Sequence, residues 1–281
     1  MKLINPSVEL ITQTPGLEGI YKQIERVGRV CYKSEDKITE ESAKPFVERM
    51  VKSQHLAMLE HGTVYLAAPY NNEDLIFWKV ANSPYSKGVC DDKSNLLCLT
   101  TNLRVIAELN AWEVIDKYLC EPTESHAKRI CLKFTTSIGV SREFNRHRVN
   151  SIAEQSTRYC NYSKEKFGGE ITFVLPNWMT SPIWDENDRA GHIFLQTMKI
   201  SEDIYLELLA EGWQPQQARE VLPLSTATEV VYTAFEDDWK HFFDLRLWEI
   251  TGKVHPNAKQ VAQLAWNKLE KYGLTRNMER H

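Results

Sequence analysis

Apolar residues recur at helical spacing in some segments of the chain and alternate with polar residues in others. The clearest helix runs from Leu17 to about Val30, because Ile20, Ile24 and Val27 share one face with Val30. The same pattern, with capping residues and prolines as end signals, predicts helices at 17–30, 39–52, 74–80, 103–119, 188–210, 215–223, 238–249 and 256–273. Strands are predicted at 7–12, 62–67, 129–136, 171–175 and 226–234.

The order of these elements indicates the fold class. Helices and strands are mixed without the regular strand–helix–strand repeat of a parallel sheet. We therefore predict an α+β protein, a single domain over residues 1–281, in which a central mixed or antiparallel sheet is flanked by helices. Residues 69–128 are the hardest to interpret, and we predict that they form a long insertion in this domain.

Composition and charge narrow the classes of function. The chain of 281 residues has a net charge of −4, so we expect no nucleic-acid partner bound by bulk electrostatics. Neither a secretory signal nor a run of roughly eighteen apolar residues is present, so we expect no membrane partner. The six cysteines form no Cys-x-x-Cys pair and suggest no zinc site. Reduced thiols in a cytoplasmic protein without a metal site are therefore predicted.

The segment from Ser141 to Tyr162, SREFNRHRVNSIAEQSTRYCNY, is basic in a chain that is acidic overall. It holds four arginines against two glutamates. Arginine binds phosphate and carboxylate groups through two parallel hydrogen bonds, and Ser156 and Thr157 add hydroxyl groups. The segment is therefore suited to binding a phosphate and a heterocycle. A solvated basic helix end with surface ion pairs is the alternative interpretation of the Arg-His-Arg triplet alone.

Helical geometry separates the members of this triplet. If residues 139–148 are helical, His147 lies on the inward face with Val140 and Phe144, whereas Arg146 points in roughly the opposite direction. Three adjacent side chains cannot all enter one pocket from one helix. We therefore expect Arg146, His147 and Arg148 to serve different groups: one ligand, a second ligand, or a neighbouring subunit.

A second arginine signal lies near the C-terminus. Trp239, Phe242, Phe243 and Arg246 fall on one face of the helix predicted from residue 238. A guanidinium group on an apolar face is costly unless it is paired. It is either a buried ion pair with a carboxylate or a group that binds a planar polar ligand. Arg219, in a short helix between two prolines, is a weaker candidate of the same kind.

Five segments together resemble one family. RHRVNSIAEQSTRY (146–159) is similar to the signature of flavin-dependent thymidylate synthases, the thymidylate synthase-complementing protein family. The other segments that resemble this family, in the same order, are RVCYKS (29–34), HLAMLEHGTVYL (55–66), QAREVLPL (217–224) and DWKHFFDLR (238–246). The resemblance covers nearly the whole chain except 69–128, where the family usually has a much shorter connection.

The resemblance implies an activity and an assembly. A member of this family converts dUMP to dTMP, with methylenetetrahydrofolate as the one-carbon donor and with FAD, reduced by NADPH, as the source of hydride. The resemblance also implies the fold of this family and a homotetramer in which several subunits build each active site. Closed symmetry of this kind is usual for homo-oligomers.

Site residues follow from the resemblance position by position. Arg246 takes the position of the catalytic arginine, which would contact the uracil edge and stabilise negative charge that develops on the ring. The positions implied in dUMP binding are Arg146, Glu154, Gln155, Ser156, Thr157, Arg158 and Arg219, with Glu143 where a glutamine often contacts the nucleotide. The positions implied in FAD binding are His55, Ala57, Arg146, His147, Arg148, Glu154 and His241, with Ala57 where a small hydroxyl residue is usual.

Three alternatives remain open at this stage. Ser156 could be a nucleophile, but we prefer a binding role because no base adjoins it in the motif. The chain could also be a nucleotide- or flavin-binding protein without catalysis. It could, finally, bind RNA through the Arg- and Tyr-rich segment 142–162, since aromatic side chains beside arginines stack on bases. The overall acidity of the chain argues against this last function.

Overall fold

The fold is an elongated mixture of sheets and helices. The structure is a computed structural model that describes residues 1–164, 168–179 and 188–278. Its strands are β1 (Lys2–Ile4), β2 (Ser7–Ile11), β3 (Thr63–Pro69), β4 (Lys87–Asp91), β5 (Leu96–Asn102), β6 (Arg129–Ser137), β7 (Ser151–Glu154), β8 (Thr172–Val174) and β9 (Ala227–Phe235). Its helices are α1 (Gly16–Val30), α2 (Ala43–Lys52), α3 (Leu75–Ala81), α4 (Leu103–Glu108), α5 (Trp112–Tyr118), α6 (Ile138–Phe144), α7 (Arg189–Ala210), α8 (Pro215–Ala218), α9 (Glu236–Arg246) and α10 (Pro256–Lys271). The predicted α+β class, with antiparallel sheets flanked by helices, is confirmed.

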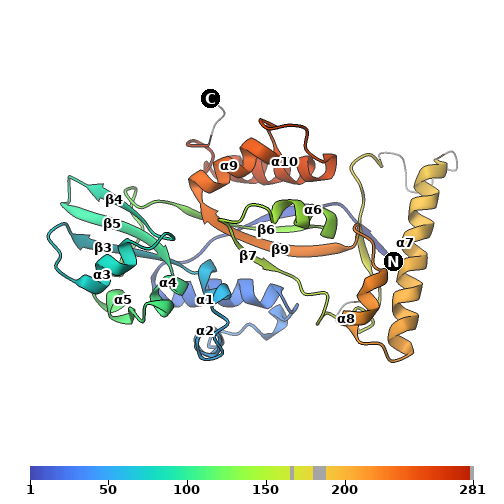
Figure 1. Ribbon diagram of the computed structural model, residues 1–281, viewed down its shortest axis with the longest axis horizontal. Helices are drawn as coiled ribbons and strands as arrows, with labels where there is room; N and C mark the ends of the chain where they lie inside the picture. The colour runs from blue at the N-terminus through green and yellow to red at the C-terminus, as the bar shows by residue number, and fades with distance from the viewer. Residues whose placement is uncertain (165–167, 180–187, 279–281) are drawn as a thin grey trace.

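A four-stranded antiparallel sheet in the order β2-β6-β9-β7 forms the centre of the molecule. Successive residues of a strand face opposite sides of the sheet, so the two faces have different partners. Leu132 and Tyr232, which pair across β6 and β9, belong to a core that includes residues of α6, α9 and α10. Cys131 and Val231 face the other way and pack with Val27 of α1. Figure 1 shows α9 and α10 above this sheet and α1 below it.

An aromatic cluster fixes α6 and α9 on the sheet. The ring of Phe134 on β6 lies 5.6 Å from the rings of both Phe144 and Tyr232, measured between centroids. The ring centroids of Trp239 and Phe242 on α9 lie 6.2 and 6.4 Å from that of Phe134. Aromatic pairs at these separations add stability beyond the area they bury. Both helices carry residues of the predicted site, so this cluster sets the position of that site.

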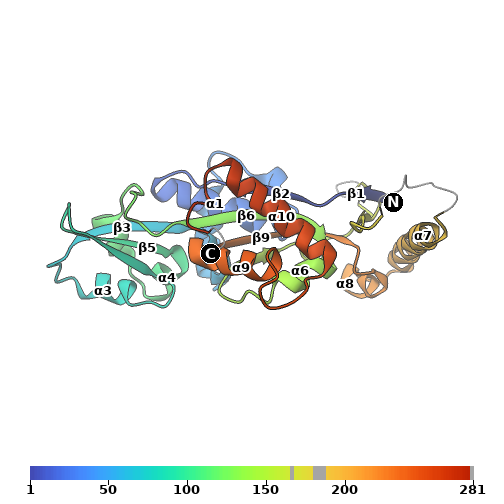
Figure 2. The ribbon, with the colours of Figure 1, turned by 90° about the horizontal axis from the view of Figure 1, so that it is seen from above.

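A second sheet, in the order β3-β5-β4, forms one end of the molecule together with α3, α4 and α5 (Figures 1 and 2). We call this unit, residues 63–118, the three-stranded subdomain. Leu66, Phe77, Leu99 and Val114 are buried in it, and their cluster continues to Ile24 of α1. The subdomain therefore shares a core with the helices beneath the central sheet.

The sequence prediction was wrong at several points in this subdomain. Strands β4 and β5 were not predicted, although the helix predicted at 74–80 is present as α3. The single helix predicted at 103–119 is two helices, α4 and α5. The chain breaks between them at Asn110, whose φ of 50° lies in the left-handed region that asparagine tolerates better than most residues.

Helix ends account for most of the other differences. Helix α2 begins at Ala43 rather than at residue 39, and the hydroxyl of Ser42 donates to the buried carboxylate of Glu25 at 2.7 Å. Helix α6 ends at Phe144, so the predicted helical path to residue 148 was wrong. Helix α9 ends at Arg246 rather than at residue 249, where Glu249 has a φ of 58°. Strands β1 and β7, each short, were not predicted.

The long helix α7 lies at the end of the molecule opposite the three-stranded subdomain (Figure 1). Its residues Met198 and Tyr205 are buried, whereas Ile193, Ile200 and Ile204 are 55%, 50% and 41% exposed. These three positions are spaced by seven and four residues, so they share one face of the helix. Among the described residues, no helix is both long enough and apolar enough to cross a membrane.

Replacement of Phe134 by alanine should lower the free energy of unfolding by about 3–5 kcal/mol, because a cavity would open among four aromatic rings. Chemical denaturation of the purified variant measures this loss. The control is Leu75→Ala, since Leu75 is 76% exposed and its loss should change stability by roughly 0.5 kcal/mol or less. Equal losses in the two variants would contradict the role of this cluster.

Candidate functional site

The guanidinium group of Arg246 lies at the centre of the candidate site. Its side chain is 14% exposed and extends from the face of α9 that carries the buried Trp239, Phe242 and Phe243. Its Nη1 donates to the carboxylate of Glu143 at 2.9 Å and its Nη2 to the Glu143 carbonyl at 2.6 Å. The ion pair that the sequence analysis left open is therefore present, with a carboxylate at the end of α6. Arginine has five N–H donors, so hydrogen bonds remain available to a ligand.

His147 is the third partner of Arg246. The Nε of Arg246 donates to Nε2 of His147 at 3.1 Å, so this imidazole accepts and is neutral. Burial, followed by the positive charge of Arg246 and by His241, lowers the pKa of His147 to about 4. The ring also packs against Phe242, with 5.0 Å between centroids. The apolar face of α9 thus holds a neutral imidazole beside a charged guanidinium.

The Arg-His-Arg triplet follows the end of α6, so the prediction that its three side chains cannot enter one pocket was wrong. His147 is buried, whereas Arg146 and Arg148 are exposed. Together with His241 and Arg246, these three residues line one pocket of about 450 Å³. Within the described residues, no hydrogen bond or ion pair engages Arg146 or Arg148. The pocket therefore offers cationic donors and an imidazole to an anionic, planar ligand.

Glu154 connects the sheet with α6. Its carboxylate accepts hydrogen bonds from Ser141 at 2.6 Å, from Asn145 at 3.2 Å and from Thr228 at 3.1 Å. The hydroxyl of Tyr232 donates in turn to the side-chain carbonyl of Asn145. Asn145 was not predicted as a site residue, because a polar residue directly before the triplet carries no signal until Tyr232 and Glu154 contact it. These bonds fix the carboxylate of Glu154.

Thr157, Arg158 and Arg219 form a separate group. The Nη1 of Arg219 donates to the hydroxyl of Thr157 at 3.0 Å, and the buried Nε of Arg219 has no hydrogen-bond partner. Arg158 is exposed, and its guanidinium carbon lies 5.2 Å from the ring centroid of Tyr159. The backbone N–H of Ser156 is bonded to the Cys31 carbonyl at 2.8 Å. Two arginines and a hydroxyl group suit a phosphate.

His55 and Ala57 line a third region, a pocket of about 990 Å³ between α1, α2 and the chain that precedes β3. Arg29 and Arg49, which also line it, both lie over the ring of Phe46, at 5.0 and 5.2 Å from its centroid. This pocket combines an aromatic surface with cations. Such a combination suits a base and a phosphate of a nucleotide cofactor.

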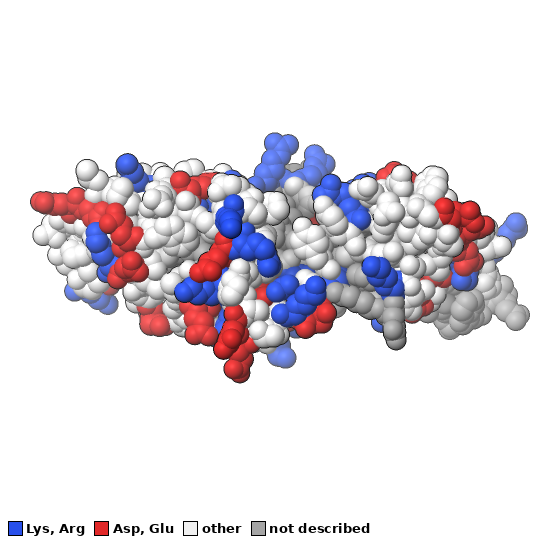
Figure 3. All heavy atoms as spheres, turned by 90° about the horizontal axis from the view of Figure 1, so that it is seen from below, with Lys and Arg blue, Asp and Glu red and all other residues white. Residues whose placement is uncertain are grey.

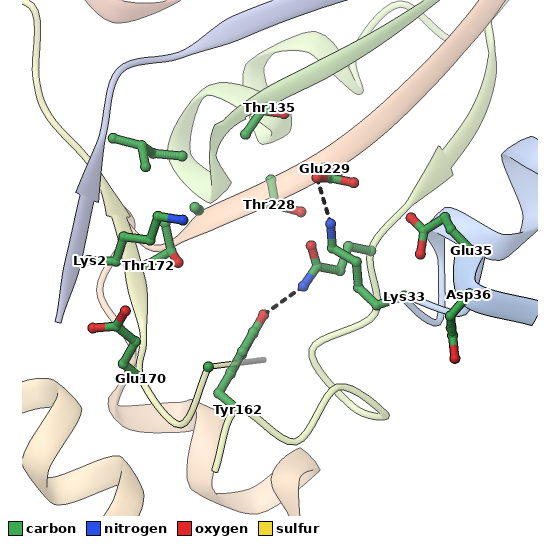
Figure 4. Close-up of a pocket in the computed structure, with 14 residues that line it drawn as sticks. Lys2, Lys33, Glu35, Asp36, Thr135, Tyr162, Glu170, Thr172, Thr228 and Glu229 are labelled. Carbon is green, nitrogen blue, oxygen red and sulfur yellow. Dashed lines mark hydrogen bonds and ion pairs between the residues drawn. The ribbon is translucent and has the colours of Figure 1, made fainter. Parts of the chain in front are cut away.

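Gln155 faces a further pocket of about 770 Å³, which Figure 4 shows beside β1, β8 and β9. The amide of Gln155 donates to the hydroxyl of Tyr162 at 3.1 Å. Across the pocket, Lys33 is paired with Glu229 at 2.5 Å. Four carboxyl groups and two lysines line this pocket, so its charge does not favour an anion.

The chain thus brings the predicted residues together in groups rather than in one cavity. The pocket that contains Arg246 includes neither Arg158 nor Arg219, and His55 and Ala57 line another pocket. Basic and acidic side chains of the described residues are interspersed over the face in Figure 3. No group of three or more histidine, cysteine or acidic side chains among the described residues could hold a metal ion.

The lowered pKa of His147 predicts a dependence of stability on pH. Between its ordinary pKa of 6.5 and about 4, the unfolded chain binds a proton that the folded protein excludes, so stability is lost as pH falls through this window. Between pH 7 and pH 4, the wild type should lose up to about 3 kcal/mol more than His147→Gln. Denaturation at several pH values measures this, with His255→Gln, at an exposed histidine, as the control. Parallel curves for wild type and His147→Gln would refute the prediction.

Comparison with known proteins places the chain in a family. Residues 100–272 match the family model described as thymidylate synthase complementing protein. Proteins named flavin-dependent thymidylate synthase from Pyrococcus furiosus and Halobacterium salinarum are each 32% identical, over 143 and 159 residues. These matches cover 49% and 48% of this chain and 53% and 64% of the relatives, so the chain spans little more than half of each relative.

A solved structure also aligns with the chain. The UMP/dUMP methylase PolB from Streptomyces cacaoi, bound with 5-Br UMP, is 15% identical with a TM-score of 0.48, over 99% of this chain and 95% of that chain. The family match spans well over half of the 281 residues. The chain therefore belongs to the family of thymidylate synthase complementing proteins.

Proposed function

We propose that this protein is a flavin-dependent thymidylate synthase that methylates dUMP to dTMP. Methylenetetrahydrofolate would supply the carbon, and FAD reduced by NADPH would supply the hydride that completes the methyl group. Membership of the family supports this proposal, as do the names of the relatives from Pyrococcus furiosus and Halobacterium salinarum. The observation that carries it is the guanidinium of Arg246, held by Glu143 and His147 at the edge of an aromatic core.

Arg246 would act on the pyrimidine ring. Three of its five N–H donors are used by Glu143 and His147, which leaves one on each terminal nitrogen for the uracil edge. Its side chain is mostly shielded from water, so its charge would stabilise negative charge on the ring more strongly than in solvent. Glu143, which holds the guanidinium plane, would orient it for this contact and would itself lie near the nucleotide.

The phosphate of dUMP would bind at the second group. Arg158, Arg219 and Thr157 offer two guanidinium groups and a hydroxyl, and Ser156 and Gln155 adjoin them in the chain. The Nε of Arg219 has no hydrogen bond and lies 3.6 Å from the carboxylate of the exposed Glu220, so a phosphate oxygen would supply its hydrogen bond. Glu154, fixed between Ser141, Asn145 and Thr228, would lie between the nucleotide and the cofactor.

The residues present fit FAD. Arg146, Arg148, His147 and His241 line the pocket beside Arg246 and would contact the cofactor there. His55 and Ala57 line the larger pocket, in which Phe46 with Arg29 and Arg49 offers a surface for an adenine and its phosphates. A neutral His147 accepts from Arg246 and so holds that guanidinium in place without adding charge.

A homotetramer with shared active sites would unite these groups. Within one chain the pocket that contains Arg246 includes neither Arg158 nor Arg219, so residues of a second copy would complete each site. The exposed isoleucines of α7 provide an apolar surface of the kind that oligomers cover. Free thiols at the described cysteines are compatible with the reducing cytoplasm, where we propose that the enzyme acts.

The first test measures catalysis and flavin binding separately. Purified protein should bind FAD and form dTMP from dUMP, methylenetetrahydrofolate and NADPH. Arg246→Ala should keep its flavin absorbance yet lower kcat by about 10²–10³-fold, as expected when a group that stabilises transition-state charge is removed. Arg276→Ala, at an exposed arginine, is the control and should retain activity. A wild type that binds FAD and dUMP without forming dTMP would support the non-catalytic alternative instead.

Ser156 should act in binding. No hydrogen bond links its hydroxyl to a base in the described residues, so activation as a nucleophile lacks a partner. Ser156→Ala should therefore raise the KM for dUMP by about tenfold and keep kcat within a few-fold of the wild type. Steady-state kinetics at saturating dUMP tests this. A Ser156→Ala variant without turnover at saturating dUMP would support a nucleophilic role for Ser156 instead.

A further inference from the structure

A pocket of about 380 Å³ lies where the three-stranded subdomain meets the central sheet. We call it the junction pocket. One wall comes from the subdomain, through Tyr85 and Lys87 at the start of β4, and the other from Arg129, Arg148 and Asn150 of the sheet and its loops. Arg148 also lines the pocket that contains Arg246. The junction pocket therefore adjoins the proposed reaction centre.

Arg129 is a cation without a carboxylate partner. Its guanidinium donates to the Glu60 carbonyl at 3.0 Å and to the hydroxyls of Thr63 and Ser151, both at 3.3 Å. Its buried Nε has no hydrogen-bond partner, and no carboxylate of the described residues lies within ion-pair distance of it. Burial lowers the pKa of Arg129 to about 10. The carboxylates of Glu60 and Asp238 act on this charge from a longer distance, so the guanidinium keeps room for an anion in direct contact.

Asn150 is unsatisfied in the same pocket. It is only 6% exposed, and both its side-chain nitrogen and its side-chain oxygen lack a hydrogen-bond partner. Buried side-chain amides almost always have partners, so an orphan of this kind requires an explanation. An amide group of a ligand would satisfy both atoms, because it offers one acceptor and one donor.

The subdomain wall adds a cation and an aromatic ring. The Nζ of Lys87 lies 4.4 Å from the ring centroid of Phe235 and is paired with Asp237, which is 71% exposed. Tyr85 is an exposed aromatic residue, at 60%. A wall of this composition suits a flat ring that carries negative charge.

The charges of the pocket sum to an excess of positive charge. Lys87, Arg129 and Arg148 line it, against the carboxyl groups of Glu60 and Asp238. The carboxylate of Glu60 forms an ion pair, at 2.5 Å, with Arg104, which does not line the pocket. Burial is the largest influence on Asp238 and raises its pKa, whereas the charges of Lys87 and Arg129 lower it. Lys87 is paired with Asp237, which does not line the pocket, so an anionic ligand would meet Arg129 and Arg148 and would compete with the exposed Asp237 for Lys87.

We infer that the junction pocket binds the tail of the one-carbon donor, a benzoyl group joined through an amide to a dicarboxylate. This inference rests on the proposed function. The ring would pack on Tyr85, the amide would satisfy Asn150, and the carboxylates would meet Lys87 and Arg129. Other arginines are proposed to bind the phosphates of dUMP and FAD. The three-stranded subdomain would therefore determine specificity for methylenetetrahydrofolate, the second substrate.

The test compares KM values of the full-length enzyme. Lys87→Ala and Tyr85→Ala should each raise the KM for methylenetetrahydrofolate by about tenfold, whereas kcat and the KM for dUMP stay within about twofold. Lys87→Arg and Tyr85→Phe keep the charge and the ring and should restore the folate KM. An unchanged folate KM in both alanine variants would overturn the inference, and so would a rise in the KM for NADPH alone.

Two controls separate binding from docking of the subdomain. Lys93→Ala removes an exposed lysine of the β4–β5 turn and should leave the folate KM unaltered. Asp237→Asn removes the ion pair with Lys87 but keeps the lysine, so the folate KM should not rise. A rise in this variant equal to that of Lys87→Ala would mean that the ion pair, rather than a ligand contact, matters, and would overturn the inference.

A fragment gives an independent measurement. p-Aminobenzoylglutamate should inhibit the wild type competitively against methylenetetrahydrofolate, and about tenfold more weakly in Lys87→Ala. Competition against dUMP or NADPH instead would refute the assignment of this pocket. A wild type that forms no dTMP under any condition would contradict the proposed function itself. A normal dTMP yield with an unchanged folate KM in the variants would overturn only the assignment of the junction pocket.

Discussion

The contact between Arg246, Glu143 and His147 is the interaction on which the candidate site depends. A guanidinium group on the apolar face of α9 is costly unless it is paired, and three acceptor atoms of Glu143 and His147, in the segment that follows β6, satisfy it. The contact joins α9 to the end of α6, two elements about a hundred residues apart in sequence. It also keeps His147 neutral, so Arg246 carries the single positive charge that Arg246 and His147 present to a ligand.

The aromatic cluster beneath this contact holds α6 and α9 in fixed positions. Phe134 on β6 touches rings from both α6 and α9, so neither helix can shift without opening a cavity. The alternation of β6 and β9 directs these rings to one face and leaves the other face to α1. The sheet face with its aromatic cluster thus provides rigidity, whereas the loops and helix ends carry the polar groups of the candidate site.

Four arginines around the candidate site have hydrogen-bond donors that the described residues do not use. Arg129 has no carboxylate within the described residues, Arg146 and Arg148 have no hydrogen bond or ion pair there, and the Nε of Arg219 has no hydrogen-bond partner. Arginines in an acidic chain would readily find carboxylates if stability alone were served. Arg129, Arg146 and Arg148 instead line two pockets that share Arg148, and these positions suit anionic ligands such as nucleotides and folates.

The sequence by itself determined the helices with strong periodicity and the α+β class, because these follow from local spacing and from the burial of apolar faces. His147 is buried as expected, but the helix assumed for that expectation ends at Phe144, so its burial depends on the contact with α9. It also identified Arg246, since a charge on an aromatic stripe is visible at helical spacing. Only the tertiary structure decided the rest. Strands β4, β5 and β7 depend on pairing with distant partners, and the break at Asn110 depends on one backbone conformation. The roles of Glu143, Asn145 and Asn150 arise where separate elements meet. Long-range contacts of this kind leave no periodic trace along the chain, because hydrogen-bond partners are selected by position in space.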